Sequence, residues 1–262
     1  MQKQLFNLCI VLALAGAISC GRSGSDNAAE SGDATEAADA VPADNTLSEA
    51  EAAAGWELLF DGETLDGWKR YNADDIGPLW AVEDGTIVCK GEGLGEGTEG
   101  IGGSLMTTRQ FGNFELSVDW KISPGGNSGI LYHVVEDPKY SHDYHTGPEF
   151  QLMDDAAWNG ELREEQKAGS NYDMHAPGPN TKVNPVGEWN TARIVYNNGH
   201  VEHWLNGEKI LEFEEGTPDY EERYKNSKWP EFPDWNKFKE GAISLQDHGA
   251  NAYFKNIKIR EL

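Results

Sequence analysis

The chain has little cysteine, little positive charge and no long apolar stretch after its first 20 residues. Its cysteines are Cys9, Cys20 and Cys89, and only Cys89 lies beyond the first 55 residues. No disulfide can therefore form within that larger part. The 45 acidic residues outnumber the 21 Lys and Arg, which gives a formal net charge of −24. Such a surface repels phosphate, so nucleic acid and anionic lipid are excluded as expected partners, whereas a neutral glycan suits it.

The first 20 residues predict an export signal. Lys3 precedes an apolar run over residues 8–18, which is too short to span a bilayer. The run ends in Ala17-Ile18-Ser19-Cys20, and small residues before a cysteine resemble a bacterial lipoprotein signal. We expect lipidation of Cys20 and export to the bacterial cell envelope, on the periplasmic or outer-membrane face. The lipid anchor would be the only membrane contact, and an ordinary cleaved signal is the alternative.

The next segment, residues 21–55, consists mainly of Ala, Ser, Gly, Asp and Glu. It has too few large apolar side chains to form a core, and its acids repel one another. We expect a disordered acidic tether. The rest of the chain, residues 56–262, carries short runs of alternating hydrophobicity between turn signals such as Asp84-Gly85 and Asn206-Gly207. This pattern predicts one all-β sandwich domain.

A strand predicted within residues 145–155 carries the first candidate site. Alternation places Glu149 and Gln151 on one face and the apolar Phe150 and Leu152 on the other. A one-residue bulge at Asp154 would turn its carboxylate to the side of Glu149. Two acids and an amide on one patch of sheet suit acid/base chemistry on a sugar, so Glu149 and Asp154 are candidate catalytic residues and Gln151 a substrate-binding one.

Two further strands are expected to complete this polar face. Near the C-terminus, alternation exposes Gln246 and His248, and an imidazole is suited to proton transfer or hydrogen-bond donation near neutral pH. In residues 127–135 the pattern turns His133 outward and Tyr132 toward the core. Asn127, Tyr132, His133 and Gln246 are the candidate substrate-binding residues, and His248 is a candidate catalytic residue.

Two readings of the remaining polar and aromatic residues stay open. His142 and His145, with Asp143 between them, could join Glu149 in a divalent-metal site, although the spacing matches no standard zinc motif and a solvated loop is the alternative. The tryptophans could be sugar-stacking platforms or core residues. Those considered are Trp80, Trp158, Trp229 and Trp235.

Several motifs in order along residues 55–262 resemble one family. They are Trp56-x-Leu58-Leu59-Phe60-Asp61-Gly62, Asn127-Ser128-Gly129-Ile130, Gly147-Pro148-Glu149-Phe150-Gln151, Glu188-Trp189-Asn190, Leu205-Asn206-Gly207 and Leu245-Gln246-Asp247-His248-Gly249. Together they are similar to the 3-keto-disaccharide hydrolase domain family. The resemblance implies a concanavalin A-like jelly-roll β-sandwich of two antiparallel sheets, and action on glycosides oxidised at C3. It also implies an upstream sugar 3-dehydrogenase as a partner. The family often has Arg where this chain has His133.

The implied reaction is cleavage of 3-keto-glycosides or 3-keto-disaccharides by base-catalysed elimination or by hydrolysis. A C3 ketone acidifies the C2 hydrogen, so a site needs a base and donors for the enolate oxygen. Two alternatives stay open: a non-catalytic, lectin-like carbohydrate-binding module, and a glycosidase acting on unoxidised glycans. For the second, Glu149 and Asp154 would be the paired carboxyl groups.

Overall fold

The computed structural model describes residues 43–91, 102–158 and 161–262. The predicted signal at residues 1–20, the lipidation site Cys20 and the tether up to residue 42 lie outside these ranges, so they stay predictions. Among the described residues, no helix has the length and apolar character needed to cross a membrane.

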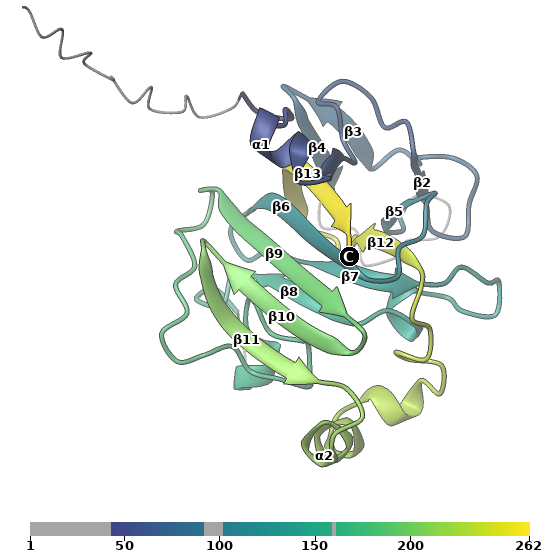
Figure 1. The fold of residues 1–262 in the computed structure, drawn as a ribbon, viewed down its shortest axis with the longest axis vertical. Helices are drawn as coiled ribbons and strands as arrows, with labels where there is room; N and C mark the ends of the chain where they lie inside the picture. Colours follow the sequence, from purple (N-terminus) through teal and green to yellow (C-terminus); the bar gives the residue numbers. More distant parts are fainter. Residues whose placement is uncertain (1–42, 92–101, 159–160) are drawn as a thin grey trace, which may run out of the picture. The chain divides into compact units, whose positions relative to one another are not determined.

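The larger sheet contains eight strands, and every neighbouring pair in it is antiparallel. They are β1 (Glu57–Leu58), β3 (Trp80–Glu83), β4 (Thr86–Lys90), β6 (Phe114–Ile122), β9 (Asn190–Asn197), β10 (His200–Leu205), β11 (Glu208–Glu214) and β13 (Asn251–Glu261). Their order is β11-β10-β9-β6-β13-β4-β3, and β1 pairs with β13. The last strand of the chain therefore lies inside the sheet, between β6 and β4, as Figure 1 shows.

The smaller sheet contains five antiparallel strands. They are β2 (Trp68–Arg70), β5 (Leu105–Thr107), β7 (Asn127–Val134), β8 (Glu149–Met153) and β12 (Ala242–Leu245). Their order is β2-β5-β12-β7-β8, so β12 is also an interior strand and β8 lies at an edge. The strand predicted within residues 145–155 is confirmed, and it is shorter than that stretch, from Glu149 to Met153.

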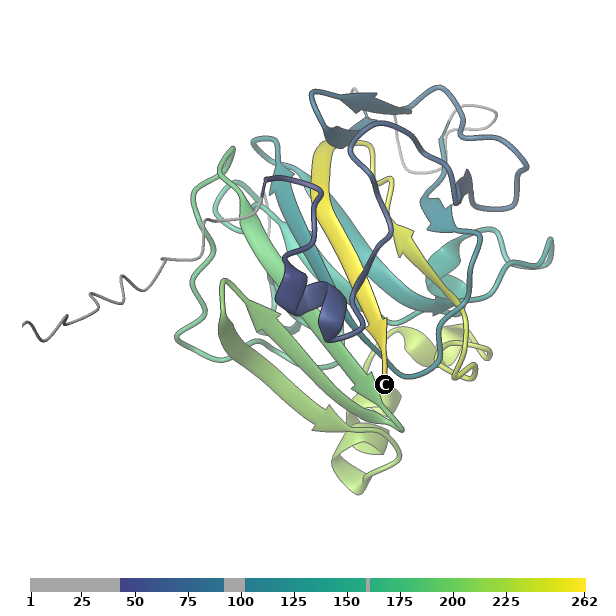
Figure 2. The same ribbon diagram turned by 45° about the horizontal axis from the view of Figure 1, so that its top comes forward.

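Helices are few and short among the described residues. They are α1 (Glu49–Ala53), α2 (Pro218–Asn226) and the 3₁₀ turns η1 (Asp143–His145), η2 (Glu164–Gln166) and η3 (Trp229–Glu231). Thr217 caps α2 by accepting a hydrogen bond from the Tyr220 N–H, and Pro218 occupies the first turn. Figure 2 shows α2 beyond the ends of β10 and β11.

The hydrophobic core joins the inner faces of the two sheets. In β6, Phe114, Leu116, Val118 and Trp120 are all at most 1% exposed, as their alternation predicts. Ile130 of β7 and Phe150 of β8 belong to the same buried cluster. The expected all-β jelly-roll sandwich of two antiparallel sheets is confirmed.

Residues 43–55 correct the predicted start of the domain. The backbone N–H of Asn45 donates to Asn256 Oδ1 (2.6 Å), and the Asn256 N–H donates to Asn45 Oδ1 (2.9 Å). The Asn45 side chain also donates to Gly85 O. Ser48 and Glu51 form a capping box that starts α1. The predicted tether is therefore wrong for residues 43–55, because local capping and one pinned asparagine fix a segment that has almost no core of its own.

Candidate active site

Strand register brings the predicted polar side chains to the outer face of the smaller sheet. Leu131 of β7 pairs with Glu149 of β8, and Gly129 pairs with Gln151. The N–H of Gln246 donates to Gly129 O across the β7–β12 edge (2.9 Å). Because paired residues share a face, Glu149, Gln151 and Gln246 all lie opposite the core.

These side chains surround a hollow of about 90 Å³. Its lining consists of Asn127, Tyr144, Glu149, Gln151, Tyr172, Lys228, Gln246 and His248. Five of the residues singled out from the sequence are thus brought together: Asn127, Glu149, Gln151, Gln246 and His248. The other three come from η1, from the connection after β8 and from the segment before η3.

Glu149 occupies space that Gly129 leaves open. A Cβ placed on Gly129 would lie 2.8 Å from both Cγ and Cδ of Glu149, closer than real Cβ contacts allow. The glutamate is 4% exposed. The glycine thus allows a carboxylate to lie flat on the sheet and face the hollow.

Unused acceptors point to a polar ligand. Asn127 Oδ1 and Gln246 Oε1 are buried and have no hydrogen-bond partner among the described residues. Buried amide oxygens normally have partners, because desolvating one without compensation costs about 1–3 kcal/mol. Gln151 is different, since its Oε1 accepts a hydrogen bond from the Leu152 N–H (3.0 Å). The two unused acceptors are suited to the hydroxyl groups of a sugar.

His248 lies at the rim of the hollow and is held there by the residue before it. Asp247 is 1% exposed, and its two carboxylate oxygens accept hydrogen bonds from the N–H groups of Gly103 (2.9 Å) and Gly249 (3.0 Å). These bonds fix the backbone around His248. Although its own side chain is exposed, surrounding protein atoms desolvate the ring and lower the pKa of His248, which favours neutral imidazole.

Lys228 is the functional candidate that sequence reasoning missed. Its ammonium group lies over the rings of Tyr172 (4.6 Å), Tyr144 (5.2 Å) and Trp229 (4.5 Å). Its backbone N–H donates to Asp173 Oδ2 (2.7 Å). The aromatic rings therefore hold a cation in a hollow that also contains the Glu149 carboxyl.

Asp154 does not join Glu149, which corrects the predicted pair. The β7–β8 register runs without a bulge to the Asn127–Met153 pair, so Asp154 is not turned to the Glu149 face. Its carboxylate accepts hydrogen bonds from the N–H groups of Gly125 (2.9 Å) and Ala157 (3.3 Å). Asp154 holds two turns together and does not line the hollow.

The predictions for His133 and Tyr132 as substrate contacts are also wrong. His133 has a left-handed backbone (φ 55°), which interrupts the alternation and turns its ring inward. The ring Nε2 lies 2.9 Å from Gly112 O and the ring packs against Tyr196. Burial lowers the pKa of His133 to about 4, so it is neutral. Tyr132 is fully buried in the core.

The suggested metal ligands do not converge. Among the described residues, the one group of three or more ligand atoms within 4.8 Å of one another is His200, Glu202 and Glu212 on the β10–β11 hairpin. His142 and His145 instead belong to an aromatic cluster with Tyr144 and Phe232. Of the tryptophans, Trp80 and Trp229 are core residues, whereas Trp158 is 44% exposed.

The protein is an all-β sandwich in which an acid, a cation and an imidazole line one hollow on the outer face of the smaller sheet. The chain belongs to the family described as "3-keto-alpha-glucoside-1,2-lyase-like domain", whose model matches residues 55–260. This confirms the family resemblance seen in the sequence.

Relatives agree with this assignment. A protein of Bacteroides thetaiotaomicron named 3-keto-disaccharide hydrolase is 35% identical over 292 positions, covering 100% of both chains. A crystal structure from Parabacteroides distasonis, provisionally assigned as a glycosyl hydrolase, is 43% identical, with a TM-score of 0.75, and covers 84% of this chain and 100% of that one. A second such structure from the same organism is 27% identical, with a TM-score of 0.60, and covers 79% and 99%.

Proposed function

We propose that this protein cleaves the glycosidic bond of sugars that carry a ketone at C3, by elimination across C1 and C2. The observation that carries the proposal is the meeting of Glu149, Lys228 and His248 in one hollow. The family and the name of the Bacteroides relative support glycoside cleavage. Two points of the proposal are tested by experiment: that the substrate is a 3-keto sugar, and that the bond is cleaved by elimination.

Glu149 is the base in this proposal. The C3 ketone acidifies the C2 hydrogen, and the carboxylate takes that proton while the electron pair moves to the C3 oxygen as an enolate. When the enolate collapses, the C1–C2 double bond forms and the C1–O bond breaks. The proton held by Glu149 is then available to the leaving oxygen, so the products are an unsaturated 3-keto sugar and an alcohol. Later addition of water would give net hydrolysis.

Lys228 and His248 are the groups that stabilise the enolate oxygen. Negative charge develops on that oxygen, and a fixed cation beside it lowers the barrier more than it stabilises the neutral ketone. Because the lowered pKa keeps His248 neutral near pH 7, its ring N–H can donate a hydrogen bond without transferring the proton. Asn127 and Gln246 would accept hydrogen bonds from the ring hydroxyls.

The test compares oxidised and parent sugars. We expect turnover of 3-keto-trehalose or a methyl 3-keto-glucoside, none of the parent sugars, and a product whose NMR spectrum shows a C1–C2 double bond. Glu149→Gln should lower kcat by about 10²–10⁴-fold, the usual contribution of a general base. Asp154→Asn is the matched acid-to-amide control and should keep its activity, because Asp154 lies outside the hollow.

The alternatives give different results. Turnover of the parent sugars with none of the 3-keto compounds would contradict the proposal in favour of an ordinary glycosidase. A carbohydrate-binding module would bind glycans equally well before and after Glu149→Gln and turn over neither sugar.

A further inference from the structure

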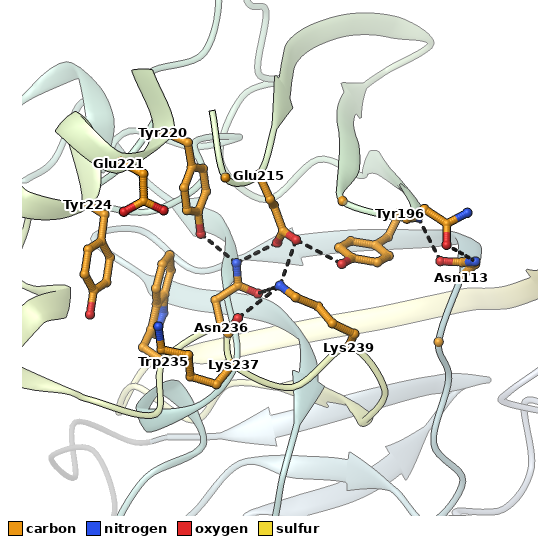
Figure 3. Close-up of a pocket in the computed structure, with 14 residues that line it drawn as sticks. Asn113, Tyr196, Glu215, Tyr220, Glu221, Tyr224, Trp235, Asn236, Lys237 and Lys239 are labelled. Atoms are coloured by element: carbon orange, nitrogen blue, oxygen red, sulfur yellow. Dashed lines mark hydrogen bonds and ion pairs between the residues drawn. The ribbon is translucent and has the colours of Figure 1, made fainter. Parts of the chain in front are cut away.

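A second, larger hollow of about 730 Å³ shares no lining residue with the Glu149 hollow. It lies among the ends of β9 and β11, helix α2 and the segment that follows η3. Its volume is within the range of small-molecule sites. Figure 3 shows Tyr220, Glu215, Asn236 and Lys239 pointing toward one another at its centre.

A hydrogen-bonded polar network forms part of the lining. Glu215 Oε2 accepts hydrogen bonds from the Tyr196 hydroxyl (3.0 Å) and the Lys239 ammonium (2.7 Å). Its Oε1 accepts one from Asn236 Nδ2 (2.6 Å). The carboxylate is thus fixed by three donors, so the network is preorganised before any ligand arrives.

One donor of this network is unused. Lys239 Nζ lies 3.3 Å from Asn236 Oδ1, which sets the orientation of that amide. Asn236 Nδ2 then donates to the Tyr220 hydroxyl (2.6 Å), so Tyr220 is the acceptor in this bond. The Tyr220 O–H has no acceptor of its own among the described residues, although the residue is only 7% exposed. A buried hydroxyl hydrogen next to a hollow is a site for a ligand oxygen.

Aromatic rings border the same hollow. Tyr224 is stacked on Trp235, with ring centroids 6.0 Å apart and planes 20° apart. Trp235 is 1% exposed, and its indole N–H also lacks an acceptor among the described residues. Tyr224 is half-buried, so part of its ring is accessible. Rings of this kind pack against the C–H faces of apolar or amphipathic ligands.

The charges along the lining balance. The ionisable acids and bases are Glu215 and Glu221 on one side and Lys237 and Lys239 on the other. With no net charge, the site favours a neutral ligand. A saccharide is a neutral ligand of this kind. Its oxygens accept hydrogen bonds, its hydroxyls donate them, and its C–H faces stack on aromatic rings.

We propose that this hollow is a second carbohydrate-binding site, which takes a neutral, unoxidised saccharide unit and performs no chemistry on it. It would hold glycan near the chain independently of the Glu149 hollow. The inference rests on the lining of the larger hollow and does not depend on the proposed elimination.

The experiment uses the full chain with Glu149→Gln, so that no probe is consumed. Trehalose, cellobiose and maltose are each titrated into the millimolar range while amide resonances are followed by NMR. We expect at least one of them to shift the amides of Gly199, Gly216 and Lys239 in a saturable way. Tyr220→Phe, which removes only the hydroxyl, and Tyr224→Ala should each weaken that binding about tenfold, equivalent to ~1.4 kcal/mol.

A matched control is Tyr253→Ala on β13, which removes a partly buried tyrosine that does not line the hollow. It should leave the titration unchanged. The absence of saturable shifts at these amides with all three sugars would overturn the proposal. So would shifts that survive both Tyr220→Phe and Tyr224→Ala. Failure of the 3-keto turnover assay would leave this result standing.

Discussion

The side chain of Glu149 lies against the Cα of Gly129 on the neighbouring strand, in space that only a glycine leaves open. The two residues are not directly paired, because Gly129 is opposite Gln151 and Glu149 is opposite Leu131. The contact is therefore diagonal and places the carboxylate of the edge strand β8 over its neighbour β7.

Gly129→Ala should displace the base without removing it. The new Cβ would meet Cγ and Cδ of Glu149 at 2.8 Å, so the side chain must move. A misplacement of about 1 Å costs on the order of 10²-fold in rate. We expect kcat on the 3-keto substrate to fall by about that factor while the thermal midpoint changes little. The same substitution at Gly112, where a Cβ would make only an ordinary contact 3.7 Å from Lys239 O, is the control. An unchanged kcat in Gly129→Ala would contradict the placement of Glu149.

Lys228→Met should remove the cation and keep much of the side-chain stem. The aromatic rings of Tyr144, Tyr172 and Trp229 would still pack on it, so the fold should be maintained. Loss of one fixed group beside the enolate oxygen should lower kcat by about 10²–10³-fold, with a smaller effect on KM. Steady-state kinetics measure this. Lys225→Met on the exposed side of α2 is the control, and equal losses in both variants would argue against a local role.

Replacing His248 by glutamine should lower kcat less than replacing it by alanine. A neutral imidazole acts here through its N–H, which the glutamine amide can imitate. We expect His248→Ala to lose about 10²-fold in kcat and His248→Gln to lose less. Parallel kinetics on one 3-keto substrate decide this. If glutamine is no better than alanine, His248 acts through proton transfer and the donor role is wrong.

Asn45→Ala should destabilise the domain, although Asn45 lies in neither sheet. The change removes the side-chain oxygen that accepts from the Asn256 N–H and the amide that donates to Gly85 O. It also places alanine at a left-handed backbone position (φ 55°). Loss of these bonds should lower the free energy of unfolding by about 1–3 kcal/mol in urea titrations. Thr46→Ala, one residue later, should have a much smaller effect, and equal values for the two would show that the segment is not pinned at Asn45.

Three buried histidines should make the domain less stable in mild acid. Burial lowers the pKa of His133 and His203 to about 4 and that of His175 to about 3. Unfolded histidine has a pKa of about 6.5, so below that pH the unfolded state binds protons that the folded state does not. The free energy of unfolding should therefore fall as the pH drops from about 6.5 toward 4, by up to ~1.4 kcal/mol per pH unit for each residue.

Urea titrations at several pH values measure this dependence. His203→Gln should make the slope of the free energy of unfolding against pH shallower by the contribution of one buried histidine. An unchanged slope in His203→Gln would mean that His203 titrates normally in the folded protein.

The parts of the site that follow strand periodicity were predictable from the sequence. Glu149, Gln151 and Gln246 face the hollow because residues two apart on a strand share a face. The order of the strands, which places β12 beside β7, comes from long-range pairing and has no local signal. Sequence could therefore indicate the strands that contribute to the site, but not how they meet.

The errors at His133 and Lys228 come from local departure from regular geometry, whereas the error at Asp154 comes from expecting a departure that is absent. The left-handed backbone at His133 turns its ring inward, and the neighbouring Gly241 could not carry a Cβ without meeting the His133 backbone. Asp154 was expected in a bulge that the strand does not contain. Lys228 was missed because it lies in an irregular segment with no period. Its one clue is the neighbouring Trp229-Pro230, an aromatic residue and a rigid proline next to a lysine.

The position of β12 and β13 has a consequence for how the protein is made. Both strands come later in the sequence than the strands they pair with, yet each lies inside its sheet, between β5 and β7 in one case and between β6 and β4 in the other. Neither sheet can be completed until those residues are available, and Gln246 and His248 arrive with them. The newly synthesised chain should therefore acquire both its stability and its active site only after β12 and β13 have been made, in a late step dominated by contacts between distant residues.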